Sequence, residues 1–167
     1  MIMKNYIPGI LLGLVVWTSL AVSTRAQEYY VYVAAESDDE VSLLRFDGTE
    51  LKVIKTIGIG TWPNEIEGPH GLTVSPDGEF WYLSIAHGFP NGKVVKYKTG
   101  SDELIGEVEV GLFPATMAIS EATGLLYVVN FNSHGRMSEE SSVSVIETET
   151  MTEIERIPQG IMPHGSR

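Results

Sequence analysis

The stretch Leu125-Leu126-Tyr127-Val128-Val129-Asn130 decides the fold, because similar stretches occur at two earlier places in the chain, residues 29–35 and 80–86. Each of the three stretches sets a tyrosine among apolar residues, and the tyrosines recur about every 45 to 50 residues, a period typical of repeat proteins. A second marker, a proline, recurs at nearly the same period. The tyrosines are Tyr32, Tyr82 and Tyr127, and the prolines are Pro69, Pro114 and Pro163.

Within each repeat the sequence predicts four short strands joined by turns. Residues 75–78 read Ser-Pro-Asp-Gly, in which proline presets the turn, aspartate bonds its own backbone and glycine takes a positive φ. Residues 107–110 alternate Glu-Val-Glu-Val, as expected of a half-buried strand. No helical periodicity is evident after residue 26. Units of roughly 45 residues with four antiparallel strands are typical of β-propeller blades, so we predict an all-β propeller.

The repeats also predict how the chain is divided. We expect a first blade over 28–58 that contains only strands b to d, a second over 69–110 and a third over 113–157, with a fourth beginning at 163–167. About three blades are fewer than the roughly four to eight of closed propellers. We therefore expect an incomplete ring that is a fragment of a longer propeller. Its unpaired blade flanks favour self-association.

The composition indicates the cellular compartment of the protein and excludes some classes of partner. The 167 residues include 22 Asp and Glu but 11 Lys and Arg, and a net charge of -11 argues against nucleic acid as a partner. Cysteine is absent, which excludes disulfides, thiolate metal sites and cysteine nucleophiles. Residues 1–26 combine Lys4, a long apolar run and small residues before Gln27, as in a secretory signal peptide. We expect a periplasmic or secreted protein with no stable membrane span after processing; a retained N-terminal anchor is the alternative.

A family resemblance is carried by Leu126-Tyr127-Val128-Val129-Asn130 and by Val143-Ser144-Val145-Ile146-Glu147-Thr148. With the Gly-x-x-Pro and Ser-Pro-Asp-Gly segments, these stretches resemble the YVTN-type β-propeller repeat over nearly all of residues 28–167. Propellers of this group are similar to the propeller parts of quinoprotein amine dehydrogenases, nitrous-oxide reductases and cytochrome d1 proteins. They also resemble surface-layer proteins and seven-bladed lactonases. A fold with so many chemistries does not identify one of them.

Histidine gives the sharpest functional signal, because the strand order places all four histidines on one face of the propeller. His70 and His164 lie in Pro-His-Gly segments where inner strands begin, and His87 and His134 lie in loops between strands b and c. Neutral imidazole is a common ligand of zinc, copper and iron, so one hypothesis is a ligand or metal site at the channel mouth, with His70 and His164 as metal ligands. The other hypothesis is structural, with the imidazoles bonding to backbone.

The repeat limits the metal hypothesis in one respect. His70 and His164 are two blades apart, so we expect them not to share a small ion without the missing blades. For the identity of the metal, the resemblance to nitrous-oxide reductases implies copper, and haem iron uses the same type of ligand.

Other candidates lie on the same face. Trp62 and Glu65 belong to a long insert before His70 and are candidate ligand-binding residues, with Asn64 and Glu67 beside them. The acidic loops 36–40 and 138–140 carry carboxylates suited to a hard cation, but without the spacing of a calcium loop. Arg136 is placed to meet an anion. Trp81 and Phe131 are expected in the core.

No catalytic motif is present: the chain has no phosphate-binding Gly-rich loop, no Gly-x-Ser-x-Gly and no His-Glu-x-x-His. We therefore predict an exported binding or assembly scaffold that takes a protein or small-molecule ligand at the channel mouth. The alternative is the propeller portion of a periplasmic metal- or haem-dependent oxidoreductase, or of a seven-bladed lactonase. A surface-layer array is a third hypothesis.

Overall fold

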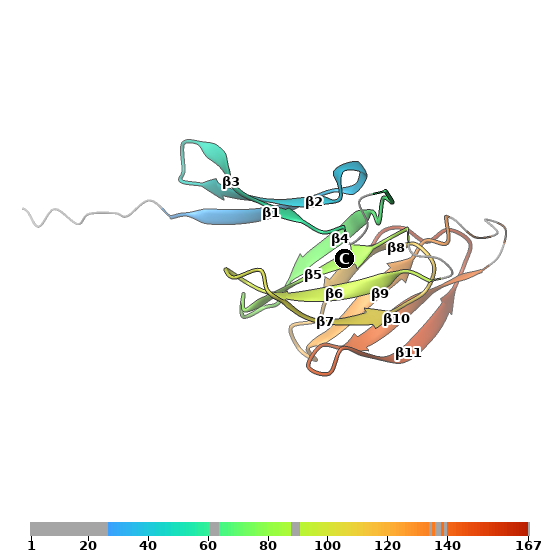
Figure 1. The fold of residues 1–167 in the computed structure, drawn as a ribbon. Coiled ribbons are helices and arrows are strands. Elements are labelled where there is room, and N and C mark those ends of the chain that lie inside the picture. Colours follow the sequence, from blue (N-terminus) through green and yellow to red (C-terminus); the bar gives the residue numbers. More distant parts are fainter. Residues whose placement is uncertain are drawn as a thin grey trace, which may run out of the picture.

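The fold consists of three antiparallel sheets that follow one another along the chain (Figure 1). The structure is a computed structural model that describes residues 27–60, 64–87, 91–133, 135, 138 and 140–166. Blade 1 has the strand order β1-β2-β3, blade 2 has β4-β5-β6-β7 and blade 3 has β8-β9-β10-β11. These sheets confirm the prediction of an all-β, incomplete propeller with no closed ring. The predicted signal peptide, residues 1–26, lies outside the described residues.

The strands coincide with the predicted segments to within a few residues. In blade 1 they are β1 (Tyr29–Ala35), β2 (Glu40–Phe46) and β3 (Leu51–Gly58). In blade 2 they are β4 (Pro69–Val74), β5 (Phe80–Ile85), β6 (Lys93–Lys98) and β7 (Leu104–Glu109). In blade 3 they are β8 (Pro114–Ile119), β9 (Leu125–Asn130), β10 (Ser141–Glu147) and β11 (Thr152–Gln159). The single helical turn of the described residues is η1 (Glu36–Asp38), a 3-10 turn between β1 and β2.

The turn predicted at residues 75–78 joins β4 to β5 and shows why the sequence folds back there. The hydroxyl of Ser75 donates to the Asp77 carboxylate at 2.5 Å, and the same carboxylate accepts the N–H of Glu79 at 2.9 Å. Gly78 has a φ of 73°, which glycine adopts without steric cost. These contacts hold the pKa of Asp77 below its usual range, chiefly through the Ser75 hydrogen bond. The turn is therefore built by its own side chains.

Along the second strand of each blade, successive side chains point alternately toward the following and the preceding blade. Tyr32 faces blade 2, where its ring stacks on Trp81 with centroids 4.8 Å apart, and Trp81 in turn stacks on Tyr97 at 4.2 Å. Tyr82 points the opposite way from Trp81, into the core that blade 2 shares with blade 3. The tyrosine of the repeat thus faces the following blade, and its neighbours face the preceding one. The core lies between the blades and is aromatic between blades 1 and 2.

A buried carboxylate joins blades 1 and 2 at the outer end of this core. Asp102, in the turn between β6 and β7, accepts hydrogen bonds from the Tyr32 hydroxyl and the Trp81 indole N–H, each at 3.0 Å. Its second oxygen accepts from Lys55 Nζ at 2.6 Å, and its side chain is 2% exposed. Burial, and then the bond to Asp102, raise the pKa of Tyr32 to about 12.

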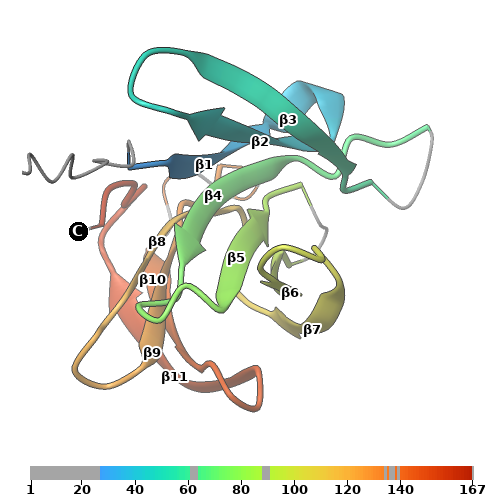
Figure 2. The same cartoon turned by 90° about the vertical axis from the view of Figure 1, so that its left-hand side faces the viewer.

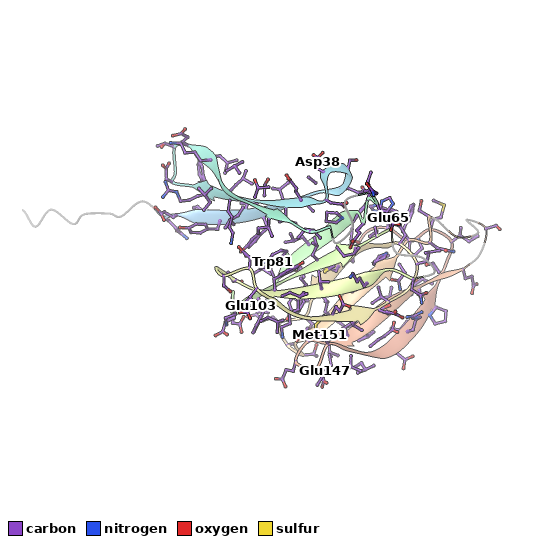
Figure 3. All side chains as sticks on the ribbon, in the orientation of Figure 1. Asp38, Glu65, Trp81, Glu103, Glu147 and Met151 are labelled. Atoms are coloured by element: carbon purple, nitrogen blue, oxygen red, sulfur yellow. The ribbon has the colours of Figure 1, made fainter. Side chains whose placement is uncertain are left out.

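The three blades fan out, with blade 2 between the other two (Figure 2). β4 contacts both β1 and β8, so the innermost strands of successive blades are neighbours. Figure 3 shows Asp38 and Glu65 at one end of the sheets and Glu103, Glu147 and Met151 at the other. The η1 turn and the insert before β4 therefore lie at the same end of the sheets. Among the described residues, no helix has the length and apolarity that crossing a membrane requires.

Candidate site at the channel mouth

The candidate site is a carboxylate held against two imidazoles from the neighbouring blade. Glu36 is the first residue of η1 in blade 1, and its Oε1 lies 2.8 Å from Nε2 of His87. Its other oxygen, Oε2, lies 3.9 Å from Nε2 of His70. The three side chains are 22 to 40% exposed, so they are reached by solvent but not surrounded by it. Two blades thus build one polar site.

His70 is oriented by the backbone of a third blade. Its Nδ1 lies 3.0 Å from the carbonyl oxygen of Ala115 in β8, and since a carbonyl only accepts, Nδ1 carries the proton. The second nitrogen, Nε2, therefore presents a lone pair toward Glu36 when the ring is neutral. This backbone bond agrees with the structural hypothesis for His70. Pro69 and His70 are the first residues of strand β4, where an inner strand was expected to begin.

Glycines let the backbone approach these rings. A Cβ on Gly71 would lie 2.1 Å from the Ala115 carbonyl oxygen, so β4 and β8 come this close because residue 71 has no side chain. A Cβ on Gly68 would lie 1.9 Å from Cδ2 of His87, so the His87 ring rests directly on this glycine, whose φ is +69°. The repeat spacing does not predict either contact, because each joins segments that lie far apart in sequence.

The acidic loop 36–40 holds the insert that precedes β4: Asp39 Oδ2 accepts the N–H of Glu67 at 3.1 Å and Oδ1 accepts that of Gly68 at 2.8 Å. Ser37, Asp38 and Glu40 of the same loop are exposed. Asp39 has a φ of 51°, a conformation that aspartate tolerates better than most residues. The sequence placed the acidic loop 36–40 on this face but did not single out Glu36 or Asp39 within it. The available signal was the equivalence of this loop to the loops that carry His87 and His134.

Aromatic rings form the inner wall of the site. Phe113, just before β8, lies 5.4 Å from His70 and 5.5 Å from His87, measured between ring centroids. Phe131 lies 5.8 Å from Phe113 and 5.1 Å from His164. Phe113 is 7% exposed and has a positive φ of 53°. Sequence reasoning missed Phe113, although it stands just before a repeated proline, at the start of an inner strand.

His164 joins this group, contrary to expectation. Its ring centroid lies 5.9 Å from that of His70, although two blade starts separate them in the repeat. The expected separation was wrong because inner strands converge at the mouth, and because Thr116 of β8 donates a hydrogen bond to the His164 carbonyl oxygen. The structure therefore brings together His70, His87 and His164.

The other predicted residues are placed as follows. Glu65 is exposed and lies on the same face, with no contact to the imidazoles among those described. Trp81 is fully buried, as predicted, and Phe131 is half-buried. Trp62, His134 and Arg136 lie outside the described residues. Within the part of the chain that is described, no three His, Cys, Asp or Glu side chains are grouped as metal ligands would be.

Comparisons with solved structures agree with a propeller. Hydrazine synthase from Kuenenia stuttgartiensis matches with a TM-score of 0.63 and 23% identity, over 78% of this chain and 34% of that one. A candidate 6-phosphogluconolactonase from Bacteroides fragilis matches with a TM-score of 0.61 and 20% identity, over 80% of this chain and 37% of that one. A similar candidate from Bacteroides uniformis matches with a TM-score of 0.57 and 19% identity, over 79% of this chain and 38% of that one.

At these identities the likeness shows the fold, and the chain spans 34 to 38% of the length of these structures. The curated proteins contain no significant match. The family described as "Lactonase, 7-bladed beta-propeller" matches residues 21–156, which is most of the sequence. The repeats, the three sheets and this match lead to one conclusion: the chain belongs to the lactonase family of seven-bladed β-propellers.

Proposed function

We propose that the complete propeller binds a lactone at the channel mouth and hydrolyses it, with Glu36, His70 and His87 in the reacting region. The observation that carries the proposal is the Glu36 carboxylate set between two imidazole Nε2 atoms, at 2.8 and 3.9 Å. The family match supports the reaction class. The fixed Nδ1–H of His70 supports a base, because it leaves an unprotonated nitrogen beside the carboxylate.

The reaction we propose is a balanced hydrolysis. His70 Nε2 and Glu36 Oε2 are 3.9 Å apart, too far for a direct hydrogen bond but suited to holding one water molecule between them. His70 takes a proton from that water as its oxygen adds to the ring carbonyl. The tetrahedral intermediate then collapses by breaking the ring C–O bond, and the proton returns to the departing alkoxide. The product is one hydroxy acid, and no oxidant or reductant is consumed.

The test is hydrolysis of glucono-δ-lactone by the full chain, followed as proton release above the buffer rate. Loss of a general base typically costs about 10²–10⁴-fold in rate, so His70→Gln and Glu36→Gln are expected to fall in that range. Glu50→Gln is the matched control, because Glu50 lies in the turn between β2 and β3, on the opposite face. Equal activity in His70→Gln and the wild type contradicts the proposal. So does the absence of both hydrolysis and calorimetric binding of gluconate.

We also propose that the blades are of the YVTN repeat type and that the protein is exported. The Tyr-Val pairs in β1 and β9, with Tyr82-Leu83 at the equivalent place in β5, support the repeat type, and the apolar run before Gln27 supports export. Mass spectrometry of the protein recovered from a periplasmic extract tests export. A chain that begins at Gln27 agrees with it, and a chain that retains residues 1–26 contradicts it.

A scaffold role is the second proposed function, favoured by apolar residues left exposed on blade 1. Val31, Val33 and Val53 are 46, 45 and 59% exposed, although they alternate with residues that are packed against blade 2. Exposed apolar surface of this kind marks a protein-binding site.

A further inference from the structure

We infer that Ser84 is a positioning residue for His70, because its buried hydroxyl holds the bulge of β4 that turns the imidazole toward Ala115. Ser84 lies in β5 of the middle blade and is 0% exposed. Since its side chain is fully buried, it acts on the site through His70 and not on a ligand directly. The effect on lactone hydrolysis rests on the proposed function, whereas the effect on the imidazole does not.

The bulge lies at the start of β4. The register of β4 against β5 shifts between Pro69 and Leu72. Two residues of β4, His70 and Gly71, therefore stand opposite Ser84 alone, which is the arrangement of a β-bulge. The Ser84 hydroxyl takes the place of a ladder partner, because its oxygen accepts the N–H of Gly71 at 2.7 Å. A side chain, and not the strand backbone, thus satisfies the buried N–H that directly follows His70.

Blade 3 shows the same strand start without such a hydroxyl. The register of β8 against β9 also shifts there, between Pro114 and Thr116. Val129 occupies the place of Ser84, since each directly precedes the residue that pairs with the repeated proline. Thr116, which like Gly71 stands two residues after that proline, remains in the ladder opposite Val129. The departure of Gly71 from the ladder therefore coincides with the serine.

The same hydroxyl faces the carbonyl group that fixes the His70 proton. Ser84 Oγ lies 3.4 Å from the carbonyl oxygen of Gly71 and 3.5 Å from that of Ala115. The Ala115 oxygen also accepts the Nδ1–H of His70 at 3.0 Å, and its two lone pairs allow it to meet both groups. Ser84, the bulge and the Ala115 carbonyl thus form one packed cluster, in which a movement of Gly71 also moves His70.

The cluster predicts what removal of the hydroxyl does to the imidazole. Ser84→Ala leaves the Gly71 N–H without its acceptor, so β4 must move to pair that N–H with the backbone, as in blade 3. His70 Nδ1 then moves away from the Ala115 carbonyl oxygen. The Glu36 carboxylate, 3.9 Å from Nε2, favours a proton on that nitrogen. We therefore expect Ser84→Ala to shift neutral His70 from the Nδ1–H toward the Nε2–H tautomer.

Long-range ¹H–¹⁵N correlation of the full chain measures this tautomer directly. Ser144→Ala is the matched control, because Ser144 is also 0% exposed and its hydroxyl also accepts an N–H, from Asn130 Nδ2 at 2.9 Å. It lies in β10 of blade 3, and its loss is expected to leave the His70 resonances at their wild-type positions. Ser84→Thr keeps the hydroxyl oxygen and is expected to keep the Nδ1–H tautomer.

An unchanged tautomer in Ser84→Ala overturns the inference. Equal changes in Ser84→Ala and Ser144→Ala also overturn it, because they indicate a general loosening of the core, and so does a Ser84→Thr variant that behaves like Ser84→Ala. If Ser84→Ala does not fold, hydrogen exchange of the wild type decides. The Gly71 amide is expected to be as protected as the ladder amide of Leu72, and exchange as fast as in an exposed loop contradicts the bond to Ser84.

Hydrolysis of glucono-δ-lactone measures the consequence for the proposed function. Ser84→Ala is expected to lower kcat by up to about 10²-fold, the cost of misplacing a catalytic group by about 1 Å, with KM close to the wild-type value. A changed tautomer with an unchanged kcat contradicts the role of Ser84 in hydrolysis. A wild type that shows no hydrolysis contradicts the proposed function instead, and the tautomer of His70 then decides the role of Ser84 by itself.

Discussion

At the scale of single residues, Asp102 does the most to hold two blades together. It accepts from three groups on two blades, and its side chain is 2% exposed. Because its φ is +57°, the turn also depends on a residue that tolerates the left-handed region. The sequence alone marks it only as one more acid in a polar turn, since its partners lie up to 70 residues away.

Asp102→Ala is expected to lower the free energy of unfolding by about 3 kcal/mol. The change leaves the Tyr32 hydroxyl and the Trp81 N–H without an acceptor in a packed interface, and each such loss typically costs about 1–3 kcal/mol. Urea unfolding followed by tryptophan fluorescence measures the difference. Glu103→Ala, at the exposed neighbouring position, is the control and is expected to stay near wild type. Equal effects of the two substitutions would contradict the role of Asp102.

Tyr32 is expected to make stability fall at alkaline pH. Its pKa is raised from 10.0 to about 12, first by burial and then by the hydrogen bond to Asp102. The folded state therefore favours the protonated phenol, so this contribution is complete below pH 10 and is lost as the pH rises toward 12. The measurement is the free energy of unfolding as a function of pH. Subtracting the values for Tyr32→Phe from those of the wild type isolates the contribution of Tyr32 from those of the other tyrosines. A difference that does not change over this range counts against the burial of Tyr32.

At the scale of elements, strand β4 connects the site to the fold. Its register against β5 shifts between Pro69 and Leu72, which turns His70 toward the Ala115 carbonyl instead of continuing the ladder. The repeats correctly predict that a strand starts near this point. They do not predict the register shift or the contact of β4 with β8, because that contact joins residues far apart in the sequence.

Gly71→Ala is expected to destabilise the protein by roughly 1–3 kcal/mol, the usual cost of overpacking. The added Cβ would meet the Ala115 carbonyl oxygen at 2.1 Å and Ser84 Oγ at 3.1 Å, so β4 and β8 must separate. Gly58→Ala in β3 is the control, because its Cβ would meet nothing within 4 Å. Thermal unfolding compares the two. A neutral Gly71→Ala would mean that the two inner strands are not in close contact.

At the scale of the whole molecule, three blades converge on one end and bring the site together. The repeat predicts the three sheets and their strands, and it predicts that His70, His87 and His164 lie together at one end of the sheets, because periodic apolar residues and turn residues are local signals. The repeat does not predict the contacts that Glu36 and Phe113 make with the imidazoles, or the close approach of His164 to His70. Those contacts join different blades, and their distances depend on how closely the inner strands pack.

The central claim is that Glu36 of blade 1 lies between His70 and His87 of blade 2. Long-range ¹H–¹⁵N correlation of the imidazole nitrogens tests it most directly, on the wild type and on Glu36→Gln. The account predicts that neutral His70 carries its proton on Nδ1, and that Glu36→Gln shifts the Nε2 resonances of both His70 and His87 while His164 changes less. A proton on Nε2 of His70, or a response confined to one of the two rings, would contradict it.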